Sequence, residues 1–254
     1  MSERPQKADG VSGGAGGRRM FVSAVWVAAN HGGAALISIG TLVAMARLLD
    51  PVEFAVAAVA FSVVSLFTPL AEGFFNDVVL QRRSLGPRDL SSAWLASLAL
   101  GAALSVLVWL AAPAVAAFVR LPEVAEVLPW MGLTLVIGST AAVPAAFARR
   151  RGHYRSLAVR NVPGRLVGAA LGVGAAALGF GAWSIVAQHL AGTTITTALD
   201  LAGAKLRLRP ALFSFQRLRG LVRFSLASLT DMLILPAYAR IATPLMSALL
   251  GPEP

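Results

Sequence analysis

Long apolar segments separated by short polar stretches make up most of this chain after its first twenty residues. A helix needs about 20 mostly apolar residues to cross a bilayer. Seven segments approach or exceed that length: Phe21–Leu49, Phe54–Leu80, Leu90–Phe118, Leu128–Ala148, Leu166–Leu178, Trp183–Leu201 and Phe224–Leu250. The fifth is short unless it begins near Val162, and the sixth is polar for a span. The pattern predicts an all-α polytopic membrane protein with about seven transmembrane helices.

The amino-acid composition supports a membrane protein and argues against a metal site. Hydrophobic residues make up 57% of the 254 residues, charged residues only 13%, and the mean hydropathy is +0.72. Soluble domains carry about 25% charged residues, so this chain could not cover a soluble globule with polar side chains. It has no cysteine, and its three histidines, His31, His153 and His189, are too scattered to suggest a zinc site. We expect no metal and no cofactor.

The basic residues are distributed unevenly along the chain. The net charge is +10, and 19 of the 22 basic residues lie in the N-terminal tail or in the stretches after the second, fourth and sixth segments. The opposite loops hold only Arg47 and Arg120. The positive-inside rule then predicts that the N-terminus lies in the cytoplasm and the C-terminus outside. Nucleic acid is not an expected partner, because no water-exposed basic stretch carries interleaved aromatic residues.

Four regions follow from these patterns. Residues 1–19 are predicted to be a flexible basic cytoplasmic tail, and residues 20–203 a six-helix transmembrane lobe. Residues 204–223 form a basic cytoplasmic or interfacial linker, and residues 224–254 are the first helix of a truncated second lobe. Within Ser214–Phe224, arginines alternate with Phe, Leu and Val. This predicts a short interfacial helix with its arginines toward lipid phosphates and its apolar side toward the acyl chains; the alternative is a plain basic loop.

An internal repeat supports the division into lobes. The stretches that begin at Phe21 and Phe224 both follow arginines, run as apolar helices and end in Leu-Leu-Asp-Pro or Leu-Leu-Gly-Pro. A glutamate follows each proline, at Glu53 and Glu253. If the two helices open equivalent halves, the chain is half of a transporter of about twelve to fourteen spans plus one helix. The alternative is a coincidence between two apolar helices.

Several ordered motifs resemble a known family. They are ARLLDPVEFAVAAVAF from Ala46, VVLQRRSLGPRDLSSAWLASLALG from Val78, VPAAFARRRGHYRSLAVRN from Val143 and LGFGAWSIVAQHLAG from Leu178. Each is similar to a helix junction of the bacterial oligosaccharide and lipopolysaccharide flippases, the Wzx-like polysaccharide transporters of the multidrug and toxin extrusion superfamily. The resemblance covers nearly the whole chain beyond the tail, in the right order.

The resemblance implies two six-helix lobes around a central cavity that opens alternately to each face of the membrane. It implies a substrate, an undecaprenyl-pyrophosphate-linked oligosaccharide for lipopolysaccharide or exopolysaccharide synthesis, that is flipped from the cytoplasmic to the periplasmic leaflet. The partners would be membrane lipids, the polysaccharide assembly machinery, and a C-terminal half or a second copy. No ATPase module is apparent, so ion gradients or substrate removal would supply any energy coupling.

Three other readings remain. A multidrug exporter of the same superfamily would need an acidic cavity for organic cations, and acidic intramembrane residues are few here. A membrane enzyme would need clustered acid–base or metal-binding residues, and neither Asp-x-Asp nor His-x-x-x-His occurs, so we expect no enzymatic activity. The third is a fragment that is inactive alone.

A pyrophosphate and its sugars need a polar path through hydrocarbon. The candidate cavity residues are polar or charged groups within the segments: Asn30, His31, Arg47, Glu72, Asp77, Gln188, His189, Asp231 and Arg240. Each has a structural alternative, such as an interhelical hydrogen bond or a place at the membrane interface. Gly168 and Gly172 form a small-xxx-small pair, which indicates close helix packing.

Arg240 lies deeper in its segment than Asp231, at a place where a charge must face a cavity or a partner. We therefore expect Arg240→Ala, in an active protein, to reduce export of the linked glycan without lowering the amount of protein in the membrane. Surface polysaccharide and an immunoblot of membranes would be measured together. Normal polysaccharide at normal protein levels would remove Arg240 from the candidate site.

Overall fold

A computed structural model describes residues 32–82, 85–204, 206, 214–216, 218–223 and 225. Every regular element in these residues is a helix, which confirms the predicted all-α class. The helices are Gly32–Leu48, α2 Pro51–Gly73, α3 Asn76–Gln81, α4 Pro87–Val119, α5 Val124–Arg150, α6 Tyr154–Ala177 and α7 Trp183–Gly203. A further short helical stretch lies within residues 215–225.

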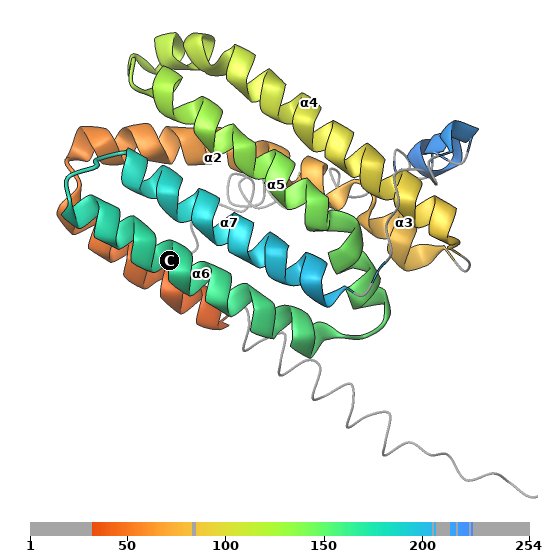
Figure 1. The fold of residues 1–254 in the computed structure, drawn as a ribbon. Helices are drawn as coiled ribbons and strands as arrows, with labels where there is room; N and C mark the ends of the chain where they lie inside the picture. Colours follow the sequence, from red (N-terminus) through yellow and green to blue (C-terminus); the bar gives the residue numbers. More distant parts are fainter. Residues whose placement is uncertain are drawn as a thin grey trace, which may run out of the picture.

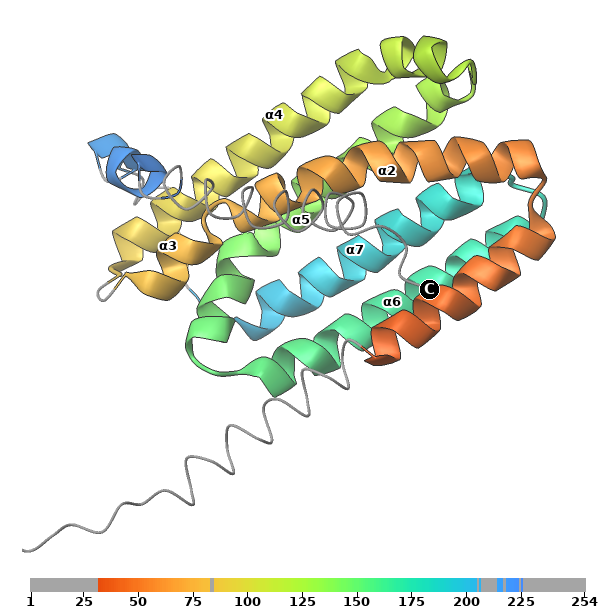
Figure 2. The same ribbon diagram turned by 180° about the vertical axis from the view of Figure 1, so that it is seen from behind.

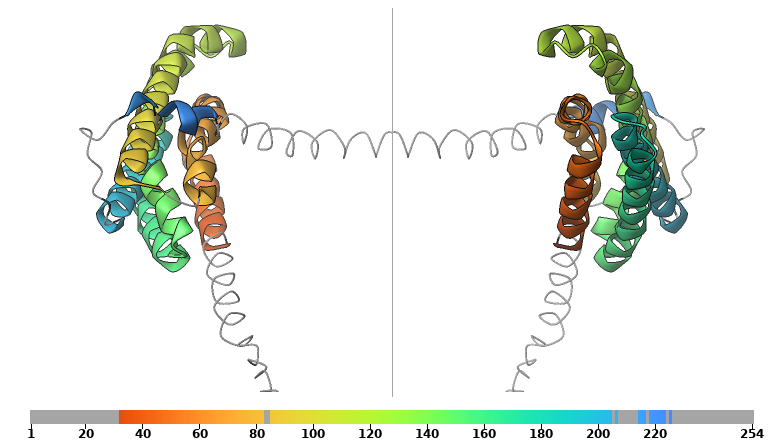
Figure 3. Two further views of the ribbon diagram at one scale, coloured as in Figure 1. Left: turned by 90° about the vertical axis from the view of Figure 1, so that its right-hand side faces the viewer. Right: turned by 90° about the vertical axis from the view of Figure 1, so that its left-hand side faces the viewer.

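The helices are arranged in two layers. Figure 1 shows the chain running back and forth along one direction, so that consecutive long helices are antiparallel. Helix 32–48 and α2 lie on one side, and Figure 2 shows them in front of α6 and α7. Seen edge-on in Figure 3, these two helices form one layer, and α4, α5, α6 and α7 form the other. Short turns join the helices at the two ends of the bundle.

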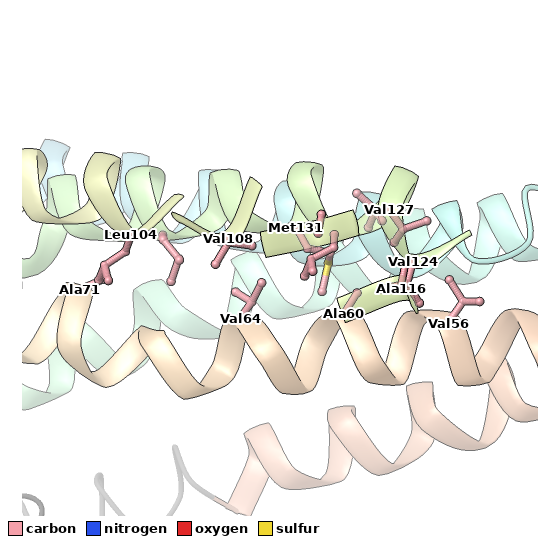
Figure 4. Close-up of a cluster of buried hydrophobic side chains, with 14 residues drawn as sticks. Val56, Ala60, Val64, Ala71, Leu104, Val108, Ala116, Val124, Val127 and Met131 are labelled. Atoms are coloured by element: carbon pink, nitrogen blue, oxygen red, sulfur yellow. The ribbon is translucent and has the colours of Figure 1, made fainter. Parts of the chain in front are cut away.

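Apolar packing closes the end of the bundle where α2 begins and α4 turns into α5. Val56, Ala60 and Val64 of α2 are at most 4% exposed and pack against α4 and α5. Figure 4 shows these side chains facing Val108 of α4 and Met131 of α5. Between membrane helices, contacts of this kind stabilise the bundle through close van der Waals packing. At the same end, the last turn of helix 32–48 packs against α6 and α7 through a smaller apolar cluster.

The opposite end carries the basic turns and a second apolar cluster. Here α3, α4 and α5 pack together, and the stretch within residues 215–225 covers them through Leu218, Leu221 and Val222. The Ser214 backbone N–H donates to Ser92 Oγ at 3.0 Å, which fixes this stretch to α4. A helical stretch is therefore present here, as predicted. Leu218, Leu221 and Val222 pack against the protein rather than the lipid, whereas Phe215 is 74% exposed.

Two segment boundaries also differ from the prediction. The second segment is not one helix, because α2 ends at Gly73 and α3 begins at Asn76. The arginine-rich stretch after the fourth segment was expected to be a loop. Instead α5 extends to Arg150 and α6 begins at Tyr154, so the fifth span starts earlier than expected and has 24 residues. Arginine is a good helix former with a long apolar stem, so it extends membrane helices.

In the part of the chain that the structure describes, three helical stretches are long and apolar enough to cross a membrane: Pro51–Gln81, Pro87–Val119 and Val124–Arg150. Gly32–Leu48 is a shorter apolar helix. Large apolar side chains such as Leu36 and Leu66, each 74% exposed, lie on the outer surface. An apolar surface of this kind is unfavourable in water and is favourable in contact with the hydrocarbon chains of lipids. The chain is therefore a polytopic membrane protein.

The two ends of the bundle provide a direct test of orientation. Because the chain lacks cysteine, single-cysteine variants give a labelling signal without background. His153 lies in the exposed turn between α5 and α6, and Glu123 is exposed at the turn before α5. By the positive-inside rule, we expect His153→Cys to react with a membrane-impermeant maleimide from the cytoplasmic side and Glu123→Cys from the other side. The reverse labelling pattern would contradict the predicted orientation.

Candidate functional site: a polar cavity between the helix layers

A cavity of about 740 Å³ lies between the two helix layers. Helix 32–48, α2, α5, α6 and α7 all contribute to its lining. It occupies the half of the bundle nearer the turn between α5 and α6, because its lining includes the last turns of α5 and α7. Its volume falls within the range of about 300–1,000 Å³ that is typical of small-molecule sites.

The lining is polar for a cavity inside an apolar bundle. Hydroxyl, amide and imidazole groups come from three of the five helices: Ser38, Thr41, Asn161, Gln188, His189, Thr193, Thr196 and Thr197. Four charged residues join them: Glu72, Arg149, Arg165 and Asp200. Charged groups within a membrane segment are costly to expose to lipid, so their convergence on one cavity marks it as the candidate site.

The charged groups are held by contacts across the helices. One guanidinium nitrogen of Arg165, on α6, donates to Ser38 Oγ on helix 32–48 at 3.3 Å. Asp200, 7% exposed near the end of α7, forms an ion pair with Arg160 of α6 at 3.8 Å. The Glu72 carboxylate lies over Gly138 of α5, in the space that a Cβ there would fill. The lining thus holds two guanidinium groups and two carboxylates, and Arg160, outside the lining, pairs with one of those carboxylates.

Close contact between α6 and α7 forms one wall of the cavity. A Cβ on Gly168 would lie 2.7 Å from the backbone oxygen of Gln188 and 3.0 Å from the Cα of Gly192. Gly172 is similarly close to Gln188. This confirms the close packing predicted from the Gly168–Gly172 spacing. The contact also sets where α7 presents Gln188 and His189 to the cavity.

The structure brings together some of the residues that the sequence indicated. Glu72, Gln188 and His189 line the cavity, and the His189 ring stacks on Phe61 of α2. Arg47 is exposed near the C-terminal end of helix 32–48, far along that helix from Ser38. The remaining candidates lie outside the described residues (Asn30, His31, Asp231, Arg240) or, for Asp77 on α3, have a side chain outside them.

Sequence reasoning missed Arg149, Arg165 and Asp200. The two arginines were counted as loop charges, although the structure places them on α5 and α6. A helical spacing of polar and small residues could have found them. On α6 the lining residues recur at Leu157, Asn161, Arg165 and Gly168, and on α7 at Gln188, Gly192, Thr196 and Asp200. Residues three or four apart share a helix face, so each series marks one face turned toward the cavity. Within the described residues, no group of three or more His, Asp or Glu side chains could hold a metal ion.

Comparison with known proteins identifies the family. The sequence profile of the family described as "Polysaccharide biosynthesis protein" matches residues 44–253, so this chain belongs to that family. The chain is 29% identical over 188 residues to the succinoglycan biosynthesis transport protein ExoT of Rhizobium meliloti (strain 1021). That match covers 73% of this chain but only 37% of the length of ExoT. No solved structure matches the chain.

The wall between α6 and α7 can be tested with two glycines of the same helix. Gly168→Ala would push a methyl group into the Gln188 backbone, whereas Gly174→Ala meets nothing within 4 Å. Overpacking costs about 2 kcal/mol, and alanine at an open helical position stabilises by up to about 1 kcal/mol. We therefore expect thermal unfolding in detergent to occur at a lower temperature for Gly168→Ala and at an unchanged or higher temperature for Gly174→Ala. Equal unfolding temperatures for the two variants would refute the close contact.

Proposed function

We propose that this chain forms part of a transporter that moves undecaprenyl-pyrophosphate-linked oligosaccharide from the cytoplasmic to the periplasmic leaflet of the inner membrane. The observation that carries the proposal is the polar, arginine-bearing cavity inside a bundle with an apolar outer surface. The family and the transport role in the name of ExoT support it. Because the match spans 37% of ExoT, we assign the complete activity to a larger assembly.

The charges of the cavity suit the substrate. Guanidinium groups bind phosphate oxygens through paired hydrogen bonds, and they keep their charge in surroundings that neutralise other bases. Arg149 and Arg165 are both cavity-lining, so they can approach a pyrophosphate from α5 and α6. The hydroxyl and amide groups of the lining, including those of Thr193 and Gln188, can exchange hydrogen bonds with sugar hydroxyls.

The distribution of apolar and polar contacts suits alternating access. Apolar clusters close the half of the bundle where α2 begins, and the cavity occupies the half nearer the α5–α6 turn. The positive-inside rule places that turn in the cytoplasm, on the side from which the substrate would load. A C-terminal half or a second copy would supply the opposing wall, and the polysaccharide assembly machinery would take up the flipped product.

Glu72 favours a second candidate, the export of organic cations, because a carboxylate in an apolar surrounding attracts positive charge. The rest of the site opposes it. Asp200 is already paired with Arg160, and Arg149 and Arg165 would repel a cation from the same cavity. Because Arg160 pairs with Asp200, the two cavity arginines face only the Glu72 carboxylate, which makes an anionic substrate the better candidate.

The test is transport of a fluorescent undecaprenyl-pyrophosphate oligosaccharide in liposomes that contain the whole assembly, purified from membranes by a tag on this chain. Lipid in the inner leaflet becomes accessible to an impermeant quencher only when it crosses the membrane. We expect Arg165→Gln to slow this exchange by at least about tenfold, because a lost charge-assisted hydrogen bond to phosphate is worth about 1.5–3 kcal/mol.

Arg88→Gln is the matched control. Arg88 is an exposed arginine in the first turn of α4, and it does not line the cavity. This variant should exchange the probe at the wild-type rate. Equal rates for wild-type and Arg165→Gln would contradict the role of the cavity. Exchange of an ordinary fluorescent phospholipid at the same rate as the glycolipid would show unselective lipid movement and contradict the proposed function.

A further inference from the structure

An aromatic pair bridges the two helix layers within the cavity. The rings of Phe61, on α2, and His189, on α7, are stacked with their centroids 4.7 Å apart and their planes inclined by 25°. Both residues line the cavity. Phe61 is 46% exposed, which is a large fraction for an aromatic side chain that stacks on another ring in the interior of the bundle.

The hydrophobic core does not use the Phe61 ring. Its neighbours Ala60 and Val64 are 0% and 4% exposed and belong to the apolar cluster between α2, α4 and α5 (Figure 4). Phe61 is a member of none of the apolar clusters found among the described residues. Phe67, two turns further along α2, packs against that cluster. The Phe61 ring thus lies on the cavity face of α2, where a ligand can reach it.

Hydrogen-bonding groups surround this aromatic surface. Gln188 precedes His189 on α7, and Thr193 follows one turn later; both line the cavity. Across the cavity, Ser38 accepts the hydrogen bond from Arg165. The site therefore combines an apolar aromatic face with a rim of amide, hydroxyl and guanidinium groups. A pyranose ring has the complementary chemistry, because its C–H groups form an apolar face and its hydroxyls lie around the edge.

We propose that Phe61 and His189 form a stacking platform for a sugar ring of the lipid-linked substrate. The proposal rests on the function proposed above and divides the cavity between two parts of one ligand. Arg149 and Arg165 bind the pyrophosphate. The Phe61 ring, held by its stack on His189, binds a pyranose on its other face, through the attraction between the polarised C–H groups of the sugar and the negative face of the π-system. The platform makes the site selective for glycan-bearing lipid over the bare lipid pyrophosphate.

The test measures binding of two probes to the full chain in nanodiscs. One probe is undecaprenyl pyrophosphate, and the other is the same lipid carrying a single pyranose, taken in turn from glucose, galactose and N-acetylglucosamine. Phe61→Leu should weaken binding of at least one sugar-bearing probe about three- to tenfold, the range expected for loss of an aromatic contact, and leave the sugar-free probe unchanged. Phe61→Trp keeps a stacking surface and should retain both affinities.

Phe118→Leu is the control for loss of a phenyl ring. Phe118 is 89% exposed in the last turn of α4 and does not line the cavity, so its loss should change neither affinity. Arg165→Gln should weaken both probes together, because both carry the pyrophosphate. Thermal unfolding of each variant identifies any loss of affinity that comes from misfolding.

Three results would overturn the platform while leaving the proposed function intact: unchanged binding of every sugar-bearing probe by Phe61→Leu, an equal loss for both kinds of probe, or a loss of binding by Phe61→Trp as large as by Phe61→Leu. If Phe61→Leu binds ethidium more weakly than the wild type but binds the glycolipid probes equally well, the two rings bind an organic cation instead. If neither lipid probe binds the correctly folded wild-type chain, the proposed function itself fails, and the platform fails with it.

Discussion

The cost of placing charge in hydrocarbon is the constraint on which this structure depends. Arginine, aspartate and glutamate within membrane helices must face a partner, a cavity or the interface. Here Glu72, Arg149 and Arg165 come from three different helices and converge on one space between two layers. The same constraint leaves the outer surface apolar, as at Leu36 and Leu66. The apolar exterior and the polar interior therefore have the same cause, which is the cost of exposing charged groups to hydrocarbon.

Close packing of small residues makes that cavity a defined site. Gly168 lets α6 approach α7 closely, and Gly138 leaves room on α5 for the Glu72 carboxylate. The Arg160–Asp200 ion pair joins α6 to α7 near the basic end. At the other end, apolar side chains of α2, α4 and α5 pack against one another. Together, the close contact between α6 and α7, the Arg160–Asp200 ion pair and the apolar packing determine which side chains a substrate would contact.

Much of the fold was predictable because the signal is strong. The second to sixth apolar segments and the described part of the first correspond to helices, and the small-xxx-small spacing on α6 marked a real helix contact. The site was predictable only in part. Glu72, Gln188 and His189 were recognised because polar residues stand out within apolar segments. Arg149 and Arg165 were not, since a residue near a segment end satisfies the positive-inside rule equally well from a loop or from a helix that lines a cavity.

Hydropathy along the sequence determined that this chain is helical and embedded in a membrane, because backbone polar groups in lipid must pair within a helix. Basic residues further determined which ends of the segments are predicted to face the cytoplasm. Tertiary structure alone decided that Arg165 reaches Ser38, that Phe61 stacks on His189, and that Asp200 pairs with Arg160. These partners are far apart in the chain, and only the packing of layer on layer sets their distances. For that physical reason the sequence is enough to predict the class of the protein, whereas the contacts within its cavity are known only from the folded structure.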